Sequence, residues 1–253
     1  MIERFGIHFA PGMDERVISV CLPRGYGQSD EHYPVMYMFD GQNAFDPDMS
    51  AYGSSWNLHE FLGEWEKNVI IVGIESSQEC DRRLAEYCPF HLPPRMGQGL
   101  RGRGRATMEW IIGALKPEID SRYRTLPDRL CTGVMGGAMG ALMSLYAVTA
   151  FNDVFSKAAC LSPMLGACYA QILRQAREGA LDANTRVYLS FGEREPRDKD
   201  ALAHMTGQML TIANTLMGKG VRTYPTIVQG GRLCEEDWAA QTERFMRFLW
   251  LNP

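Results

Sequence analysis

The chain has 253 residues, of which 45% are hydrophobic, and this is enough to bury a sizeable core in a single α/β domain over residues 1–253. A formal net charge of −4 argues against nucleic acid or an anionic membrane surface as a partner. No apolar run reaches the roughly 18 residues that cross a bilayer, and the N-terminus does not resemble a secretory signal. Seven cysteines without CxxC spacing favour a cytoplasmic protein with reduced thiols over a disulfide framework or a metal site.

Strand and helix patterns alternate in the first half of the chain. Alternating or continuous apolar runs predict strands at residues 3–9, 16–22, 34–39 and 69–74, the first two paired as a hairpin. Helical spacing covers residues 56–62 and, further on, residues 106–123, where Pro117 predicts a kink or a break. Between them, residues 76–105 are rich in Gly, Pro and Arg and are expected to form an irregular lid or binding loop.

The second half continues the same alternation. Its predicted strands cover residues 130–135, 158–161, 186–191 and 222–228, and its predicted helices cover residues 141–148, 168–178, 198–218 and 236–250. This order predicts a mostly parallel, doubly wound α/β sheet with helices on both faces. Ligands bind such sheets at the carboxyl ends of the strands, where Asp40, Ala138, Glu195 and residues 230–234 fall.

The sequence Gly136-Gly-Ala-Met-Gly140 lies between a predicted strand and a predicted helix. A strand, a tight Gly-x-X-x-Gly turn and a helix form the nucleophile elbow of α/β-hydrolases, whose central residue is normally Ser. Here the central residue is Ala138, which has no oxygen with which to attack an ester.

Longer blocks of sequence resemble a family of esterases within the α/β-hydrolases. This family includes S-formylglutathione hydrolases, feruloyl and acetylxylan esterases, enterochelin-type esterases and mycolyltransferases. The blocks that carry the resemblance are Tyr33-Pro-Val-Met-Tyr-Met-Phe-Asp-Gly-Gln-Asn43, Trp56, Val72-Gly-Ile74, Arg83-Leu-Ala-Glu-Tyr87, Leu115-Lys-Pro-Glu-Ile-Asp120, Tyr123-Arg-Thr125 and Ser144-Leu-Tyr146. The resemblance implies the α/β-hydrolase fold and carboxylic-ester chemistry.

The family's catalytic triad falls on Ala138 as nucleophile, Glu195 as acid and Leu233 as base. Leu233 replaces the His of a Gly-Gly-x-His-x-Glu-x-x-Trp block that here reads Gly230-Gly-Arg-Leu-Cys-Glu-Glu-Asp-Trp238. Without a His partner, Glu195 is expected to be a surface carboxylate or to pair with a nearby arginine, namely Arg194, Arg197 or Arg232.

Other family positions describe the pocket around the triad. The backbone N–H groups of Gln42 and Met139 correspond to the oxyanion hole, and Asp40, Trp56 and Cys234 correspond to the substrate pocket. Two alternatives stay open, since Asp40 can simply end a strand in a turn and Trp56 can be a core aromatic.

A serine hydrolase needs a hydroxyl and an imidazole, which Ala138 and Leu233 lack. The favoured interpretation is a catalytically inactive homologue that needs no cofactor and keeps a pocket for a small-molecule ester or acyl ligand. One alternative is a working serine carboxylesterase whose nucleophile has been exchanged for Ala, which predicts an intact His. Another is a different enzyme that uses Cys234 or Glu195. The sequence leaves the ligand and the formation of a homo-oligomer open.

Overall fold

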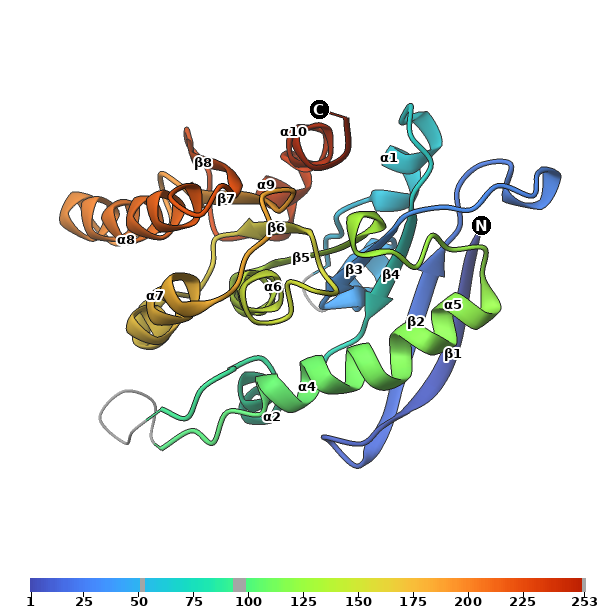
Figure 1. Cartoon of the computed structure of the whole chain (residues 1–253), viewed down its shortest axis with the longest axis horizontal. Coiled ribbons are helices and arrows are strands. Elements are labelled where there is room, and N and C mark those ends of the chain that lie inside the picture. The colour runs from blue at the N-terminus through green and yellow to red at the C-terminus, as the bar shows by residue number, and fades with distance from the viewer. Residues whose placement is uncertain (51–52, 93–98, 252–253) are drawn as a thin grey trace.

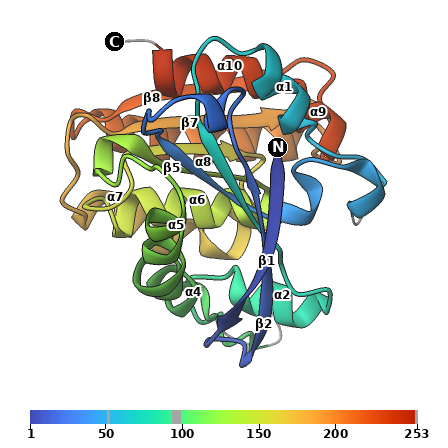
Figure 2. The ribbon, with the colours of Figure 1, turned by 90° about the vertical axis from the view of Figure 1, so that its right-hand side faces the viewer.

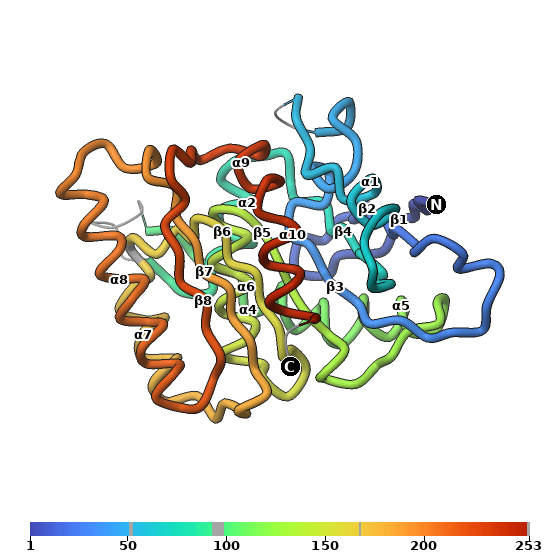
Figure 3. Tube along the Cα trace, turned by 90° about the horizontal axis from the view of Figure 1, so that it is seen from above, coloured from blue at the N-terminus to red at the C-terminus, as the bar shows by residue number. Residues whose placement is uncertain are grey.

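A single eight-stranded sheet organises the computed structural model, which describes residues 1–50, 53–92 and 99–251 (Figure 1). The strand order is β1-β2-β4-β3-β5-β6-β7-β8, and Figure 3 follows it from β8 at the left to β1 at the right. The strands are β1 Ile2–Phe9, β2 Asp14–Cys21, β3 Val35–Phe39, β4 Ile70–Ile74, β5 Thr132–Gly137, β6 Lys157–Leu161, β7 Arg186–Gly192 and β8 Arg222–Val228.

The sheet is antiparallel at one edge and parallel elsewhere. β1 and β2 form the predicted hairpin, with Ile2 opposite Cys21, and β2 is antiparallel to β4. From β4 to β8 all neighbours are parallel, so the carboxyl ends of these strands lie along one edge. Every residue of β3, β4 and β5 is buried, as expected for strands covered on both faces. The predicted α/β-hydrolase fold class is therefore confirmed.

Helices cover both faces of the sheet (Figure 2). One core cluster joins the sheet to α4, α6, α7 and α8, and a second joins it to α1, α9 and α10. The helices are α1 Leu58–Glu64, α2 Cys80–Glu86, α4 Gly104–Trp110, α5 Lys116–Arg122, α6 Ala138–Ala150, α7 Tyr169–Glu178, α8 Lys199–Met217, α9 Glu235–Ala239 and α10 Thr242–Met246. None of the helices in the described ranges is long and apolar enough to cross a membrane.

Three helical segments differ from the sequence prediction. Residues 76–105 were expected to be irregular, yet α2 lies within them, and residues 93–98 fall outside the described part of the chain. The predicted helix at residues 236–250 is divided into α9, α10 and a π-helix over Arg247–Leu251. At Pro117 the structure has a π-helical segment, Ile111–Leu115, between α4 and α5. Since proline has no N–H to donate to the preceding turn, a locally widened helix accommodates it.

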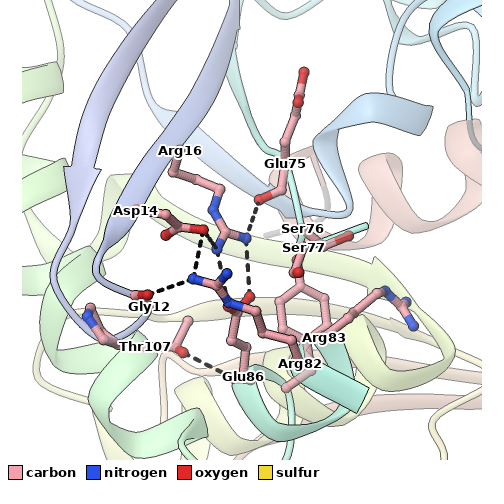
Figure 4. A network of polar contacts seen from close by, with 12 residues as sticks. Gly12, Asp14, Arg16, Glu75, Ser76, Ser77, Arg82, Arg83, Glu86 and Thr107 are labelled. Atoms are coloured by element: carbon pink, nitrogen blue, oxygen red, sulfur yellow. Dashed lines mark hydrogen bonds and ion pairs between the residues drawn. The ribbon is translucent and has the colours of Figure 1, made fainter. Parts of the chain in front are cut away.

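A buried ion pair attaches α2 to the hairpin (Figure 4). Arg16 on β2 donates through Nη1 and Nη2 to the two carboxylate oxygens of Glu86 at 3.0 and 3.1 Å, and through Nη1 to the Glu75 carbonyl at 3.0 Å. Arg82 connects Glu86 with Asp14 on the hairpin. The side chains of Arg16 and Glu86 are only 5% and 1% exposed, so each charge depends on the other.

Glu86→Gln is expected to lower the free energy of unfolding by about 3 kcal/mol, because it leaves the buried Arg16 charge without its bidentate partner. Urea denaturation measures this loss. Glu109→Gln is the matched control, since the Arg105–Glu109 pair is 68% and 54% exposed and its removal should cost less than about 1 kcal/mol. Equal losses in the two variants would contradict the role given to Arg16 and Glu86.

Candidate functional site

The tight turn predicted at Gly136–Gly140 joins the end of β5 to the start of α6. Ala138 has a φ of 50°, in the left-handed region that costs a non-glycine residue roughly 1–2 kcal/mol. Gly136 and Gly140 flank Ala138 at points where neighbouring atoms leave no room for a Cβ. A Cβ on Gly136 would lie 2.7 Å from the Gly140 carbonyl carbon, and a Cβ on Gly140 would lie 2.9 Å from the Cβ of Phe39. Packing therefore holds Ala138 in a strained conformation at the end of β3 and β5.

A cavity of about 560 Å³ opens beside this turn, and we call it the Ala138 cavity. Its lining brings together five of the residues singled out from the sequence: Asp40, Trp56, Ala138, Leu233 and Cys234. These residues come from positions far apart in the chain, which meet because parallel strands end at one edge of the sheet.

Glu195 and Met139 line a second, larger cavity of about 1020 Å³, which we call the apolar cavity. Leu233 and Met164 line both cavities, so the two spaces adjoin. Gln42 is found in neither lining. Its side-chain amide donates to Ser76 Oγ at 3.0 Å and accepts from the Ser76 N–H at 3.1 Å. An oxyanion hole formed by Gln42 and Met139 stays a prediction.

Glu195 is a partly buried carboxylate with a serine as its partner. Ser162 Oγ donates to Glu195 Oε1 at 2.6 Å, and the Gly192 N–H donates to the same oxygen. Trp238 Nε1 in turn donates to Ser162 Oγ at 2.8 Å. Burial raises the pKa of Glu195 above its ordinary value.

Within the described part of the chain, Glu195 is therefore neither a surface carboxylate nor the partner of an arginine, the two alternatives expected from the sequence. Arg197 pairs with Asp198, and Arg232 pairs with Asp237 at 3.0 Å. Ser162 was missed as a functional candidate. The only signal in the sequence is its place directly after a short strand, where it too adopts a positive φ, of 56°.

The position that the family resemblance assigns to the base is open to solvent. Leu233 is 52% exposed and lies where the two cavities adjoin. The neighbouring Cys234 has a raised pKa, because the effect of partial burial outweighs the smaller opposing effect of Arg232. A thiol with a raised pKa stays protonated near neutral pH, so Cys234 is poorly suited to act as a nucleophile.

Glu235 is a buried carboxyl group in the wall of the Ala138 cavity. It accepts from Asn43 Nδ2 at 2.9 Å and from Trp56 Nε1. Trp56 thus lines the cavity and also belongs to the buried core beside Trp238. On the same wall, Asp40 receives a bidentate contact from Arg83 at 2.7 and 2.6 Å. Glu235 and Arg83 lie in the sequence blocks described above but were not singled out as site residues.

Burial, reinforced by the nearby Asp40 carboxylate, raises the pKa of Glu235 from 4.5 to about 7. A carboxyl group whose pKa is raised in the folded state contributes stability below pH 4.5 and loses it as the pH rises to about 7. Relative to Glu235→Gln, the wild-type chain should therefore lose about 3 kcal/mol of unfolding free energy across this interval.

Urea denaturation of both chains at a series of pH values measures this difference. Glu243→Gln serves as control: its side chain is 66% exposed, and its replacement should change the unfolding free energy by less than about 1 kcal/mol over the same pH interval. A difference between wild type and Glu235→Gln that is independent of pH would contradict the burial of a titrating carboxyl group at this position.

A family model described as "Putative esterase" matches residues 13–246. A protein named "Uncharacterized protein YbbA" from Bacillus subtilis (strain 168) is 23% identical over 210 residues, which are 81% of this chain and 79% of that protein. Among solved structures, an IroE-like serine hydrolase from Shewanella oneidensis has a TM-score of 0.76 at 22% identity, covering 98% of this chain and 79% of that one. The siderophore hydrolase EstB from Aspergillus nidulans has a TM-score of 0.75 at 15% identity, covering 100% and 96%.

Proposed function

The chain belongs to the "Putative esterase" family whose model it matches. We propose that, within this family, it is a ligand-binding member without serine-hydrolase activity. The observation that carries the proposal is the residue at the strained turn. Ala138 occupies the position where an elbow presents a hydroxyl, yet its side chain ends at a methyl group. Leu233, which adjoins the same cavity, cannot accept a proton from a nucleophile.

The retained acid supports the same conclusion. In a triad the carboxylate orients an imidazole, whereas here Glu195 accepts hydrogen bonds from Ser162 and Gly192. Ser162 is itself held by Trp238, so the carboxylate has partners that do not depend on a histidine. An esterase with only its serine exchanged would keep the histidine, and the exposed Leu233 argues against that alternative.

The ligand that fits best is a small neutral molecule with an acyl chain or an aromatic ring. Apolar side chains from α6, β7, α8 and the segment after β6 dominate the lining of the apolar cavity; among them are Leu142, Met164, Leu165, Phe191 and Met205. Burying an apolar group against such walls gains roughly 25 cal/mol for each Å² removed from water. The cysteine usage predicts a cytoplasmic location. The formation of a homo-oligomer stays open.

The unmodified chain is expected to give no hydrolysis of p-nitrophenyl acetate or butyrate above that of a heat-denatured sample. Ala138→Ser with Leu233→His should restore measurable turnover, while either change alone should give almost none, because hydroxyl and imidazole act as a unit. The rate of p-nitrophenol release measures hydrolysis by the unmodified chain, the two single variants and the double variant. Turnover by the unmodified chain that Cys234→Ala abolishes would overturn the proposal in favour of a thiol enzyme.

Methyl cinnamate is a suitable probe for the apolar cavity, and calorimetric titration should detect its binding. Met205→Trp fills part of the cavity from α8 and should weaken binding by about tenfold, because the indole ring occupies the ligand's space. Leu210→Trp places the same ring on the same helix at a residue that is 42% exposed, and it should leave binding unchanged. Equal effects of the two substitutions would exclude this cavity as the binding site.

A further inference from the structure

Two thiols meet in the wall of the apolar cavity. Cys88 follows α2, and Cys168 ends the short 3-10 helix Gly166–Cys168 before α7. Their Sγ atoms lie 3.7 Å apart, although the residues are 80 positions apart in the sequence. Both side chains are buried from bulk solvent, and both contribute to the lining of the cavity. A molecule bound there would therefore contact a pair of thiols.

The position of Cys88 is fixed by its backbone neighbours. The Gly104 N–H donates to the Cys88 carbonyl at 2.8 Å, and the Tyr87 hydroxyl accepts from the Asp40 N–H at 3.0 Å. Gly102 and Gly104 allow the chain to pass this closely. A Cβ on Gly102 would lie 2.0 Å from the Phe90 carbonyl oxygen, and a Cβ on Gly104 would lie 2.8 Å from the carbonyl carbon of Cys88. The approach of the two sulfur atoms is thus a built feature of the cavity wall.

The pair differs chemically from the other buried cysteines. Cys88 Sγ lies within hydrogen-bond distance of the Phe90 carbonyl, at 3.1 Å, and of Cys168 Sγ. The hydrogen bond with Cys168 lowers the pKa of Cys88 to about 7, although burial opposes this. Cys21 and Cys160 are also buried, and burial raises the pKa of each. Thiolates, not thiols, attack electrophiles, so Cys88 is the more reactive sulfur among these residues.

We propose that Cys88 and Cys168 form a dithiol site that organic hydroperoxides, entering through the apolar cavity, oxidise to a disulfide. The Cys88 thiolate attacks the terminal peroxide oxygen and the O–O bond breaks. The leaving alkoxide takes a proton and departs as the alcohol, leaving a sulfenic acid on Cys88. Cys168 then attacks this sulfur, the S–O bond breaks, and the hydroxide leaves as water with the thiol proton. Two thiols lose two electrons in total, and the hydroperoxide becomes an alcohol and water.

The geometry favours the second step over further oxidation of Cys88. The sulfur atoms, already 3.7 Å apart, must approach to about 2.05 Å to form the bond. The site uses neither Ala138 nor Leu233, so it does not depend on whether the chain binds or hydrolyses esters. A disulfide would join the segment after α2 to the start of α7 across the cavity wall.

Two experiments on the full chain test the proposal. Dibromobimane, which becomes fluorescent only when both of its arms have reacted with thiols, should label the reduced chain. Cumene hydroperoxide at one equivalent should remove two titratable thiols and give a peptide pair linked through Cys88 and Cys168, identified by mass spectrometry after digestion. Cys88→Ala and Cys168→Ala should each abolish the dibromobimane signal. Cys88→Ala should also slow thiol loss by about tenfold or more, whereas Cys168→Ala should lose the Cys88 thiol without giving the linked peptide pair. Cys80→Ala and Cys160→Ala are the controls and should react like the unmodified chain.

Because alanine at a buried position can weaken folding, the unmodified chain supplies an independent test. No bimane fluorescence from it, or disulfides that join other cysteines after oxidation, would overturn the proposal whatever the variants do. Hydrogen peroxide should react more slowly than cumene hydroperoxide, since the cavity favours an apolar molecule. The opposite order would contradict entry through the apolar cavity.

Discussion

The buried pair between Arg16 and Glu86 attaches α2 to the hairpin, together with Arg82, and α2 or the segment after it contributes to the wall of both cavities. The guanidinium of Arg16 and the carboxylate of Glu86 are both buried, and their ion pair holds the helix to the hairpin. From this helix Arg83 reaches Asp40 at the Ala138 cavity, and the residue two positions after its end, Cys88, lines the apolar cavity. An electrostatic contact on the outer edge of the sheet therefore fixes part of the wall of each cavity.

The geometry of the Ala138 turn persists without the hydroxyl group because it is built from backbone and packing. Gly136 and Gly140 leave no room for a Cβ, and a Cβ on Gly137 would lie 2.5 Å from the Trp238 ring. Trp238 in turn donates to Ser162, the partner of Glu195. None of these contacts involves the Ala138 or Leu233 side chains. The geometry of the turn and of the adjoining cavity therefore does not depend on which side chain stands at residue 138 or 233.

Periodicity and the order of blocks in the sequence were sufficient to predict the sheet, and five of the positions singled out from the sequence line the Ala138 cavity. Strands such as Val35–Phe39 are buried on both faces and are therefore continuous apolar runs, which can be recognised from the local sequence alone. α2 was missed because its residues are mostly charged and its stability comes from Glu86, whose partner lies 70 residues away. The partner of Glu195 could not be predicted either, since Ser162 reaches it only because β6 and β7 are neighbours in the sheet.

These internal contacts also bear on what the pockets select. Glu195 is already hydrogen-bonded by Ser162 and Gly192, Glu235 by Asn43 and Trp56, and Asp40 by Arg83. A ligand that brought strong polar groups would have to displace these bonds and would leave buried partners without replacements, at roughly 1–3 kcal/mol for each group. An apolar ligand displaces none of them and gains free energy from burial alone. The apolar Leu233 and the hydrogen-bonded carboxylates thus both agree with the neutral, weakly polar ligand proposed above.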